Sequence, residues 1–258
     1  MSYSIGLAGK GGTGKTTIAG MLVNYLVDRE KIPVLAVDAD SNSNLNEVLG
    51  LKVIETLGDA REEMKKGVAT GMTKDVFMEM KLEQAIIESK GFDLIVMGRP
   101  EGTGCYCAAN TLLTQYLDRL INNYRYVVID NEAGMEHISR LTTNNIDILL
   151  IISDASRRGI LSAARISALT DELGLNIGKK FFIINQIQDR GQEDLKRLAD
   201  EYKLELVGTI PEDSNVRDFD LKGRPTVELD KESPAFINAY RIFDKIIGDT
   251  KHLVTPVF

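Results

Sequence analysis

The chain has 258 residues, enough for one large domain whose core needs no disulfide or metal staple. Its net charge of −7 argues against broad nucleic-acid binding, which usually needs a basic face. No apolar run approaches the roughly 20 residues that span a bilayer. The chain enters a strand pattern at once, without a charged-then-apolar leader, so we expect a cytosolic protein with no signal peptide.

Short apolar runs alternate with amphipathic segments, a pattern typical of an α/β fold with a mostly parallel, twisted sheet flanked by helices. The runs predict about seven strands, at residues 3–8, 33–37, 92–97, 125–130, 146–152, 180–185 and 204–210. Apolar residues at helical spacing predict helices around 18–26, 109–120 and 233–247. Residues 51–74, which several glycines interrupt, are predicted to form short helices. We expect one domain over residues 1–248 and a tail over 249–258.

The segment after the first predicted strand satisfies the phosphate-loop motif G-x-x-x-x-G-K-[ST] and opens a predicted helix. Glycines let backbone N–H groups turn inward around phosphates, and the helix N-terminus favours negative charge. Lys15 can reach the β- and γ-phosphates, and the Thr16 hydroxyl can ligate Mg²⁺. The expected nucleotide-binding residues are Gly9, Lys10, Gly11, Gly12, Thr13, Gly14, Lys15, Thr16 and Thr17.

Lys10 distinguishes this motif from a plain phosphate loop. A second lysine at this place resembles the deviant group that includes MinD, ParA and the nitrogenase iron protein. In that group, the lysine of one subunit commonly reaches the nucleotide of the other. The resemblance implies a single-domain P-loop NTPase that forms an ATP-dependent homodimer, with Lys10 and Lys15 both serving catalysis.

Two predicted strands end in carboxylates, at the edge where an open α/β sheet binds its ligand. Asp38 and Asp40 end the second strand, and Asp130 ends the fourth. By resemblance, Asp40 is the switch I residue that orients the attacking water. Asp130 is the Walker B residue that holds Mg²⁺ through water, and Asn131 begins switch II. Asp38 either shares this role or is structural.

Adenine recognition is expected at the ends of the last two predicted strands. Related proteins hold the base there through a strand-end asparagine and backbone groups, which places Asn185, Pro211, Glu212 and Asp213 at the base. Asn185 could equally be a turn former. The sequence has no N-K-x-D signature after the phosphate loop, which favours ATP and ADP over guanine nucleotides.

Both cysteines, Cys105 and Cys107, lie in the loop after the third predicted strand. On extended backbone, residues i and i+2 point to the same side, so both thiolates can occupy one edge of a tetrahedral metal site. They cannot close that site alone. A two-fold dimer with this loop at its axis would supply four thiolates, which suit Ni²⁺, Zn²⁺ or Cu(I) better than Mg²⁺. Taken alone, C-x-C is also compatible with chance proximity, a small-residue helix start or a redox pair.

Residues 97–110 (MGRPEGTGCYCAAN) and 130–137 (DNEAGMEH) resemble the CooC/AcsF group, which puts nickel into carbon monoxide dehydrogenase and acetyl-CoA synthase. The resemblance extends over nearly the whole chain. It implies an ATP-hydrolysing metallochaperone whose client is one of these nickel enzymes, with a leaning toward acetyl-CoA synthase. His137 is either a metal ligand or proton relay, or a helix-face residue bonded to a carbonyl. Arg157 and Arg158 either face the nucleotide or partner, or are solvated.

Two other functions are compatible with a phosphate loop of this type. A positioning or partition ATPase like MinD or ParA would act on membrane or DNA. The predicted C-terminal helix, however, carries mixed charge from Arg241, Asp244 and Lys245 instead of the basic face that lipid binding needs. A nitrogenase-like reductase would bridge an iron–sulfur cluster with well-separated cysteines, unlike the C-x-C pair here. We therefore expect neither membrane nor nucleic acid as partner.

Overall fold

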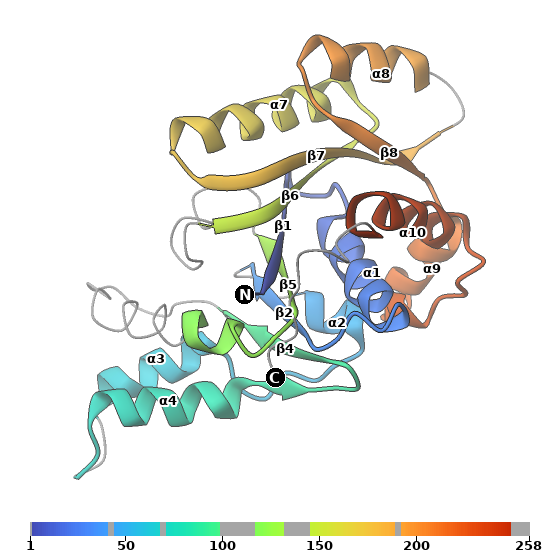
Figure 1. Cartoon of the computed structure of the whole chain (residues 1–258). Coiled ribbons are helices and arrows are strands. Elements are labelled where there is room, and N and C mark those ends of the chain that lie inside the picture. Colours follow the sequence, from blue (N-terminus) through green and yellow to red (C-terminus); the bar gives the residue numbers. More distant parts are fainter. Residues whose placement is uncertain are drawn as a thin grey trace.

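A computed structural model describes residues 2–40, 44–67, 71–98, 117–131, 145–188 and 192–248 (Figure 1). The strands in this part of the chain are β1 (Tyr3–Gly9), β2 (Val34–Ala39), β3 (Ile87–Glu88), β4 (Phe92–Val96), β5 (Tyr126–Asn131), β6 (Asn145–Asp154), β7 (Asn176–Ile187) and β8 (Leu206–Pro211). The helices are α1 (Lys15–Asp28), α2 (Leu45–Leu49), α3 (Leu57–Lys66), α4 (Lys74–Ala85), α7 (Arg157–Glu172), α8 (Gln192–Glu201), α9 (Ser214–Leu221) and α10 (Pro234–Ile247), with a 3₁₀ turn, η1, at Thr226–Glu228. Residues 117–121 are also helical.

All eight strands form one sheet in the order β3-β4-β2-β5-β1-β6-β7-β8. Every neighbouring pair is parallel except β3 and β4, which are antiparallel. The seven predicted strands are confirmed. β3 was not predicted, because a two-residue strand leaves no alternating pattern in the sequence. The α/β architecture expected from the sequence is therefore present, with one added edge strand.

Helices cover both faces of the sheet, so the central strands are apolar along their whole length. On β2, Val34 and Ala36 pack toward α1, α2 and α10, whereas Leu35 and Val37 pack toward α3 and α4. A third cluster buries β6 and β7 against α7 and α8. Figure 1 shows α7 and α8 on one side of the strands and α1 with α10 on the other. This sandwich fixes the carboxyl ends of β1, β2 and β5, where the expected site residues lie.

The predicted helices at 18–26 and 233–247 correspond to α1 and α10, and α3 lies within the 51–74 segment predicted to contain short helices. The helix predicted at 109–120 is described only from residue 117, and the tail at 249–258 lies outside the described residues. The apolar stripe of α10 is buried at Phe236, Phe243 and Ile247, which confirms a core helix.

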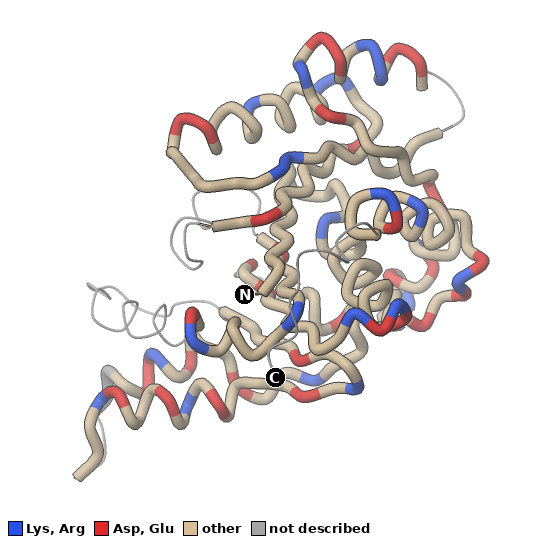
Figure 2. Tube along the Cα trace, in the orientation of Figure 1, with Lys and Arg blue, Asp and Glu red and all other residues tan. Residues whose placement is uncertain are grey.

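Positive and negative side chains do not form separate patches on α4 and α10 (Figure 2). Acidic and basic residues are interspersed along α4 and α10 (Figure 2). Among the described helices, none combines the length and apolarity that a membrane crossing requires.

Candidate nucleotide-binding site

The phosphate loop joins β1 to α1 in a conformation that depends on glycine. Gly14, the N-cap of α1, has a φ of 83° in the left-handed region. A Cβ at Gly14 would lie 2.4 Å from the side-chain nitrogen of Asn185. Both the dihedral angle and the close approach exclude a larger residue. Glycine at position 14 therefore allows both the left-handed turn into α1 and the close packing of the loop against Asn185.

The carbonyl of Lys10 organises the interior of this loop. It accepts hydrogen bonds from the Thr13 hydroxyl at 2.9 Å and from the Lys15 ammonium at 3.3 Å. Lys15 is only 7% exposed, and its burial lowers the pKa of the ammonium, an effect that the charges of Asp130 and Asp40 oppose. The Lys10 side chain is exposed. The two lysines therefore occupy different environments: Lys15 lies inside the site, whereas Lys10 faces outward.

Asp130, at the end of β5, is buried beside the first turn of α1. Its Oδ1 has no hydrogen-bond partner among the described residues, and its carboxylate is hydrogen-bonded to the Thr16 side chain. Burial is the main cause that raises its pKa to about 7. A buried carboxylate oxygen without a partner, next to a hydroxyl, fits the oxygen ligands that Mg²⁺ prefers. Thr16 and Asp130 are thus the residues that would hold this ion.

Asp38 has a structural task. Its Oδ1 accepts the backbone N–H of Asp40 at 3.1 Å, and its Oδ2 accepts the N–H of Leu45, the first residue of α2, at 3.0 Å. Burial is the main cause that raises its pKa to about 6. The side chain thus shapes both ends of the segment between β2 and α2. Asp40, at the start of this segment, lines the cleft.

Asn185 contacts the phosphate loop directly. From the carboxyl end of β7, its side-chain amide donates a hydrogen bond of 2.9 Å to the carbonyl of Thr13. The side chain is 7% exposed, so this bond is largely shielded from water. The sequence alone did not suggest this brace, because the two residues are 172 positions apart. A contact to adenine stays a prediction.

The other residues predicted to hold adenine follow β8. Glu212 binds the side chains of Gln188 and Arg217. The Asp213 carboxylate caps α9 through the N–H of Asn215 and accepts the Ser233 hydroxyl at 2.5 Å. Asp213 therefore joins β8 to the starts of α9 and α10. Contacts of Pro211, Glu212 and Asp213 with adenine stay predictions.

A cleft of about 920 Å³ connects the phosphate loop to the end of β8. The predicted residues that line it include Lys15, Thr16, Thr17, Asp40, Asn185, Pro211, Glu212 and Asp213. Residues that sequence analysis did not identify also line it, and three charged ones among them are Glu47 of α2, Arg217 of α9 and Arg224 beyond α9. No motif marks these three positions, because they reach the cleft only through the packing of α2 and α9.

The described lining of the cleft does not include every predicted site residue. Cys105, Cys107 and His137 lie outside the described residues. Arg157 and Arg158 are exposed at the start of α7. Within the described ranges, no group of three or more His, Cys, Asp or Glu side chains is placed to hold a metal ion.

A phosphate loop between β1 and α1, a buried aspartate on β5 beside Thr16 and a cleft at the carboxyl ends of parallel strands define a P-loop ATP-binding protein. Residues 5–227 match the family described as the CobQ/CobB/MinD/ParA nucleotide binding domain. The chain belongs to this family, which supports nucleotide binding and, in general terms, ATPase activity.

Individual relatives extend over almost the whole chain. An uncharacterised ATP-binding protein of Methanocaldococcus jannaschii is 41% identical over 249 residues, 95% of this chain and 98% of the relative. The carbon monoxide dehydrogenase accessory protein CooC of Rhodospirillum rubrum is 32% identical over 252 residues, 90% of each chain. The septum site-determining protein MinD of Pyrococcus horikoshii, solved with Mg-ADP, is similar in fold, with a TM-score of 0.73 at 22% identity and full coverage of both chains.

Proposed function

We propose that this protein is a Mg²⁺-dependent ATPase that assists nickel insertion into acetyl-CoA synthase or carbon monoxide dehydrogenase. The observation that carries the proposal is the 32% identity to CooC through nine-tenths of both chains. The Cys105–Cys107 pair, which follows β4 in the sequence, supplies the thiolates that such a function needs.

ATP hydrolysis, the first part of the proposed function, is assigned to residues in and beside the cleft. Lys15 neutralises charge on the β- and γ-phosphates, and Asp40 orients the water that attacks the γ-phosphorus, with ADP as the leaving group. Thr16 and Asp130 would hold Mg²⁺, and the bound ion would offset the negative charge of the phosphates. Asn185 keeps the loop in shape through Thr13. Because these groups are already in position before the reaction, they can stabilise the charge that develops in the transition state.

Nickel is the cargo of the proposed reaction cycle. Two thiolates per chain form half of a tetrahedral site, so two subunits are needed to complete it. The exposed side chain of Lys10 supports an ATP-linked dimer, because an outward-facing lysine is free to reach the nucleotide of a second subunit. The same site accepts Zn²⁺, which has the same preference for four-coordinate thiolate ligation.

Nickel binding tests the metal half of this function. Purified protein would be titrated with Ni²⁺ in the nucleotide-free, ADP and nonhydrolysable-analogue states, and the mass of each state measured. We expect one ion per dimer, with an affinity that depends on nucleotide. Replacing both Cys105 and Cys107 by Ser would abolish binding, whereas Lys15→Ala would retain nickel binding and lose its nucleotide dependence.

The client is tested separately. Nickel-free carbon monoxide dehydrogenase and acetyl-CoA synthase would each be mixed with nickel-loaded protein and ATP, and the recovered client activity compared with that of the double-cysteine variant. No nickel in any nucleotide state would refute the proposed cargo. Co-sedimentation with anionic liposomes on addition of ATP would then favour a MinD-like role.

A further inference from the structure

A chain of hydrogen bonds connects the segment containing Asp40 to the first turn of α3. The N–H of Asp40 donates to the Asp38 carboxylate at 3.1 Å. The Asp38 carbonyl accepts the N–H of Met97 at 2.9 Å, and the Met97 carbonyl accepts the N–H of Gly58 at 2.8 Å. Backbone bonds of this length tolerate little displacement before they break. Two successive backbone hydrogen bonds therefore connect Asp38 to the start of α3.

Thr56 and Gly98 add a steric contact to this connection. Thr56 caps α3 through a reciprocal capping box with Asp59. Gly98 follows the end of β4 with a φ of 66°, and a Cβ there would lie 2.4 Å from the Thr56 hydroxyl oxygen and 2.6 Å from the Thr56 Cβ. The cap of α3 thus lies directly against the chain leaving β4, and close-packed surfaces transmit displacement.

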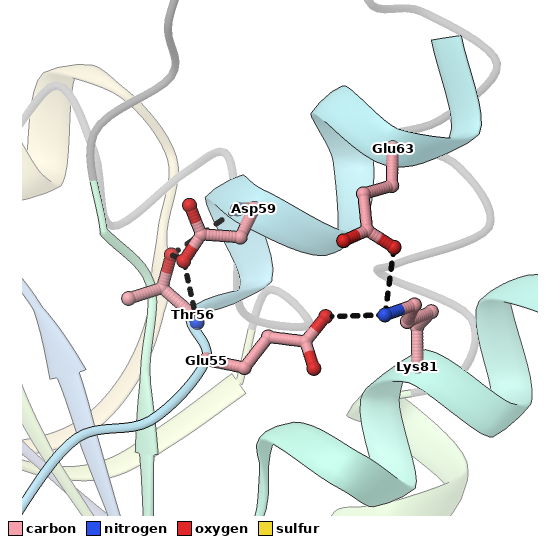
Figure 3. Close-up of polar contacts among 5 residues, drawn as sticks. All are labelled: Glu55, Thr56, Asp59, Glu63 and Lys81. Atoms are coloured by element: carbon pink, nitrogen blue, oxygen red, sulfur yellow. Dashed lines mark hydrogen bonds and ion pairs between the residues drawn. The ribbon is translucent and has the colours of Figure 1, made fainter. Parts of the chain in front are cut away.

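Lys81 joins α4 to α3. Its ammonium lies 2.8 Å from a carboxylate oxygen of Glu55 and 2.7 Å from one of Glu63 (Figure 3). The side chains of Lys81 and Glu55 are 14% and 18% exposed. Because fully exposed ion pairs contribute little to stability, this shielded cluster should hold the two helices together more strongly than a surface pair would. Apolar side chains of the two helices share one core cluster behind the ion pairs. Lys81 therefore resists sliding of α4 along α3.

We propose that α3 and α4 form a nucleotide-responsive element that is driven from Asp40 through Asp38, Met97 and Gly58. The inference rests on the ATPase half of the proposed function and does not require nickel. Bound ATP shifts a conformational balance only through contacts that differ between two states. In the proposed ATPase mechanism Asp40, which lines the cleft, acts beside the γ-phosphate, a group that ADP lacks. The connection then moves α3, and Lys81 carries α4 with it.

Hydrogen exchange measured by mass spectrometry tests whether α3 responds to the nucleotide and whether Lys81 transmits the response to α4. Full-length protein would be compared with ADP and with a nonhydrolysable ATP analogue, in peptides covering residues 57–66 and 74–85. In the wild type we expect exchange in both helices to change by about 5-fold or more between the two nucleotides. In Lys81→Met the response should persist in α3 and fall severalfold in α4, while the analogue binds with unchanged affinity.

Lys180→Met is the matched control. Lys180 also forms an ion pair, with Asp171, but toward the opposite end of the sheet from β4, where it joins β7 to α7. This variant should keep the full response in both helices. Glu63→Gln, at a half-exposed position, supplies a second and milder test, with an intermediate response in α4.

Two outcomes would overturn the proposal. One is analogue binding without any change in α3, and the other is a response of α4 in Lys81→Met as large as in the wild type. A wild-type protein that fails to bind the analogue would instead contradict the proposed ATPase, so the two failures are distinguishable.

Discussion

Asp38 and Asp130 lie opposite each other on the neighbouring parallel strands β2 and β5, yet their carboxylates have different partners. Both oxygens of Asp38 accept backbone N–H groups. Asp130 is bonded to Thr16, and its Oδ1 lacks a partner among the described residues. The same edge of the sheet thus holds one carboxylate that shapes a loop and one that is available to a cation.

The stability of the metal-free protein should depend on the protonation of Asp130. Burial raises its pKa from 3.8 to about 7, so the folded state binds more protons than the unfolded state between these values. The free energy of unfolding should therefore fall as pH rises from about 4 to about 7 and level off above. Asp130→Asn should make this decline shallower, above all between about pH 6 and 7 where the raised pKa of Asp38 no longer contributes, and leave the protein more stable than wild type at about pH 8 in EDTA, as measured by urea unfolding. Equal slopes in both proteins would contradict the assigned burial.

Asp38→Asn should have the opposite effect on stability. An amide has one acceptor oxygen, so one of the two N–H groups that now bind Asp38 loses its partner in a buried site. We expect a loss of about 1–3 kcal/mol at about pH 8, where Asp130→Asn stabilises. The same urea experiments decide the matter, and a neutral Asp38→Asn would show that the Asp40 and Leu45 amides find other acceptors.

Asn185→Ala should weaken nucleotide binding through the phosphate loop. Without its amide, the Thr13 carbonyl loses its partner on β7, and we expect about a 10-fold loss of affinity for ATP. Inorganic tripolyphosphate discriminates between mechanisms, because it has no base. If Asn185 acts by bracing the loop, tripolyphosphate affinity falls in parallel; an unchanged value would assign Asn185 to adenine. Gln188→Ala, which removes a cleft residue bonded to Glu212, should leave tripolyphosphate binding intact.

The junction of α1 and α10 should contribute to stability without affecting the site. The buried Tyr25 donates its hydroxyl to Asp244 at 2.9 Å, and Arg29 binds the same carboxylate. Asp244→Ala leaves that hydroxyl without its acceptor and should cost about 1–3 kcal/mol. Tyr240 is half-buried, but its hydroxyl bond to Asp28 is exposed to solvent, so Tyr240→Phe should cost less than about 0.5 kcal/mol. Denaturant unfolding measures both, and similar costs would contradict the assigned role of burial.

The sequence predicted those features that depend only on neighbouring residues, such as buried strands and the phosphate loop. The apolar run from Ile148 to Ile152 reads as a buried strand, and the glycines before Lys15 indicate a phosphate loop without reference to distant residues. The task of Asp38 could not be read in this way, because its structural role depends on where the N–H of Leu45 lies after folding. The motif identified the carboxylates, and only the structure distinguished them.

Long-range packing set the remaining features of the site. Arg217 and Arg224 reach the cleft because α9 folds back after β8, a path that no spacing in the sequence records. Cys105 and Cys107 lie outside the described residues, so their part in metal binding stays a prediction.

The two-residue strand β3 closes one side of the sheet. Its antiparallel pairing occupies the outer edge of β4 at Leu94 and Asp93, and Glu88 carries a charge at the new margin. An unpaired, flat edge invites other chains to add strands, whereas a very short charged one offers them little. Intermolecular strand addition is therefore disfavoured beside β4, so β3 protects the protein from self-aggregation along that margin.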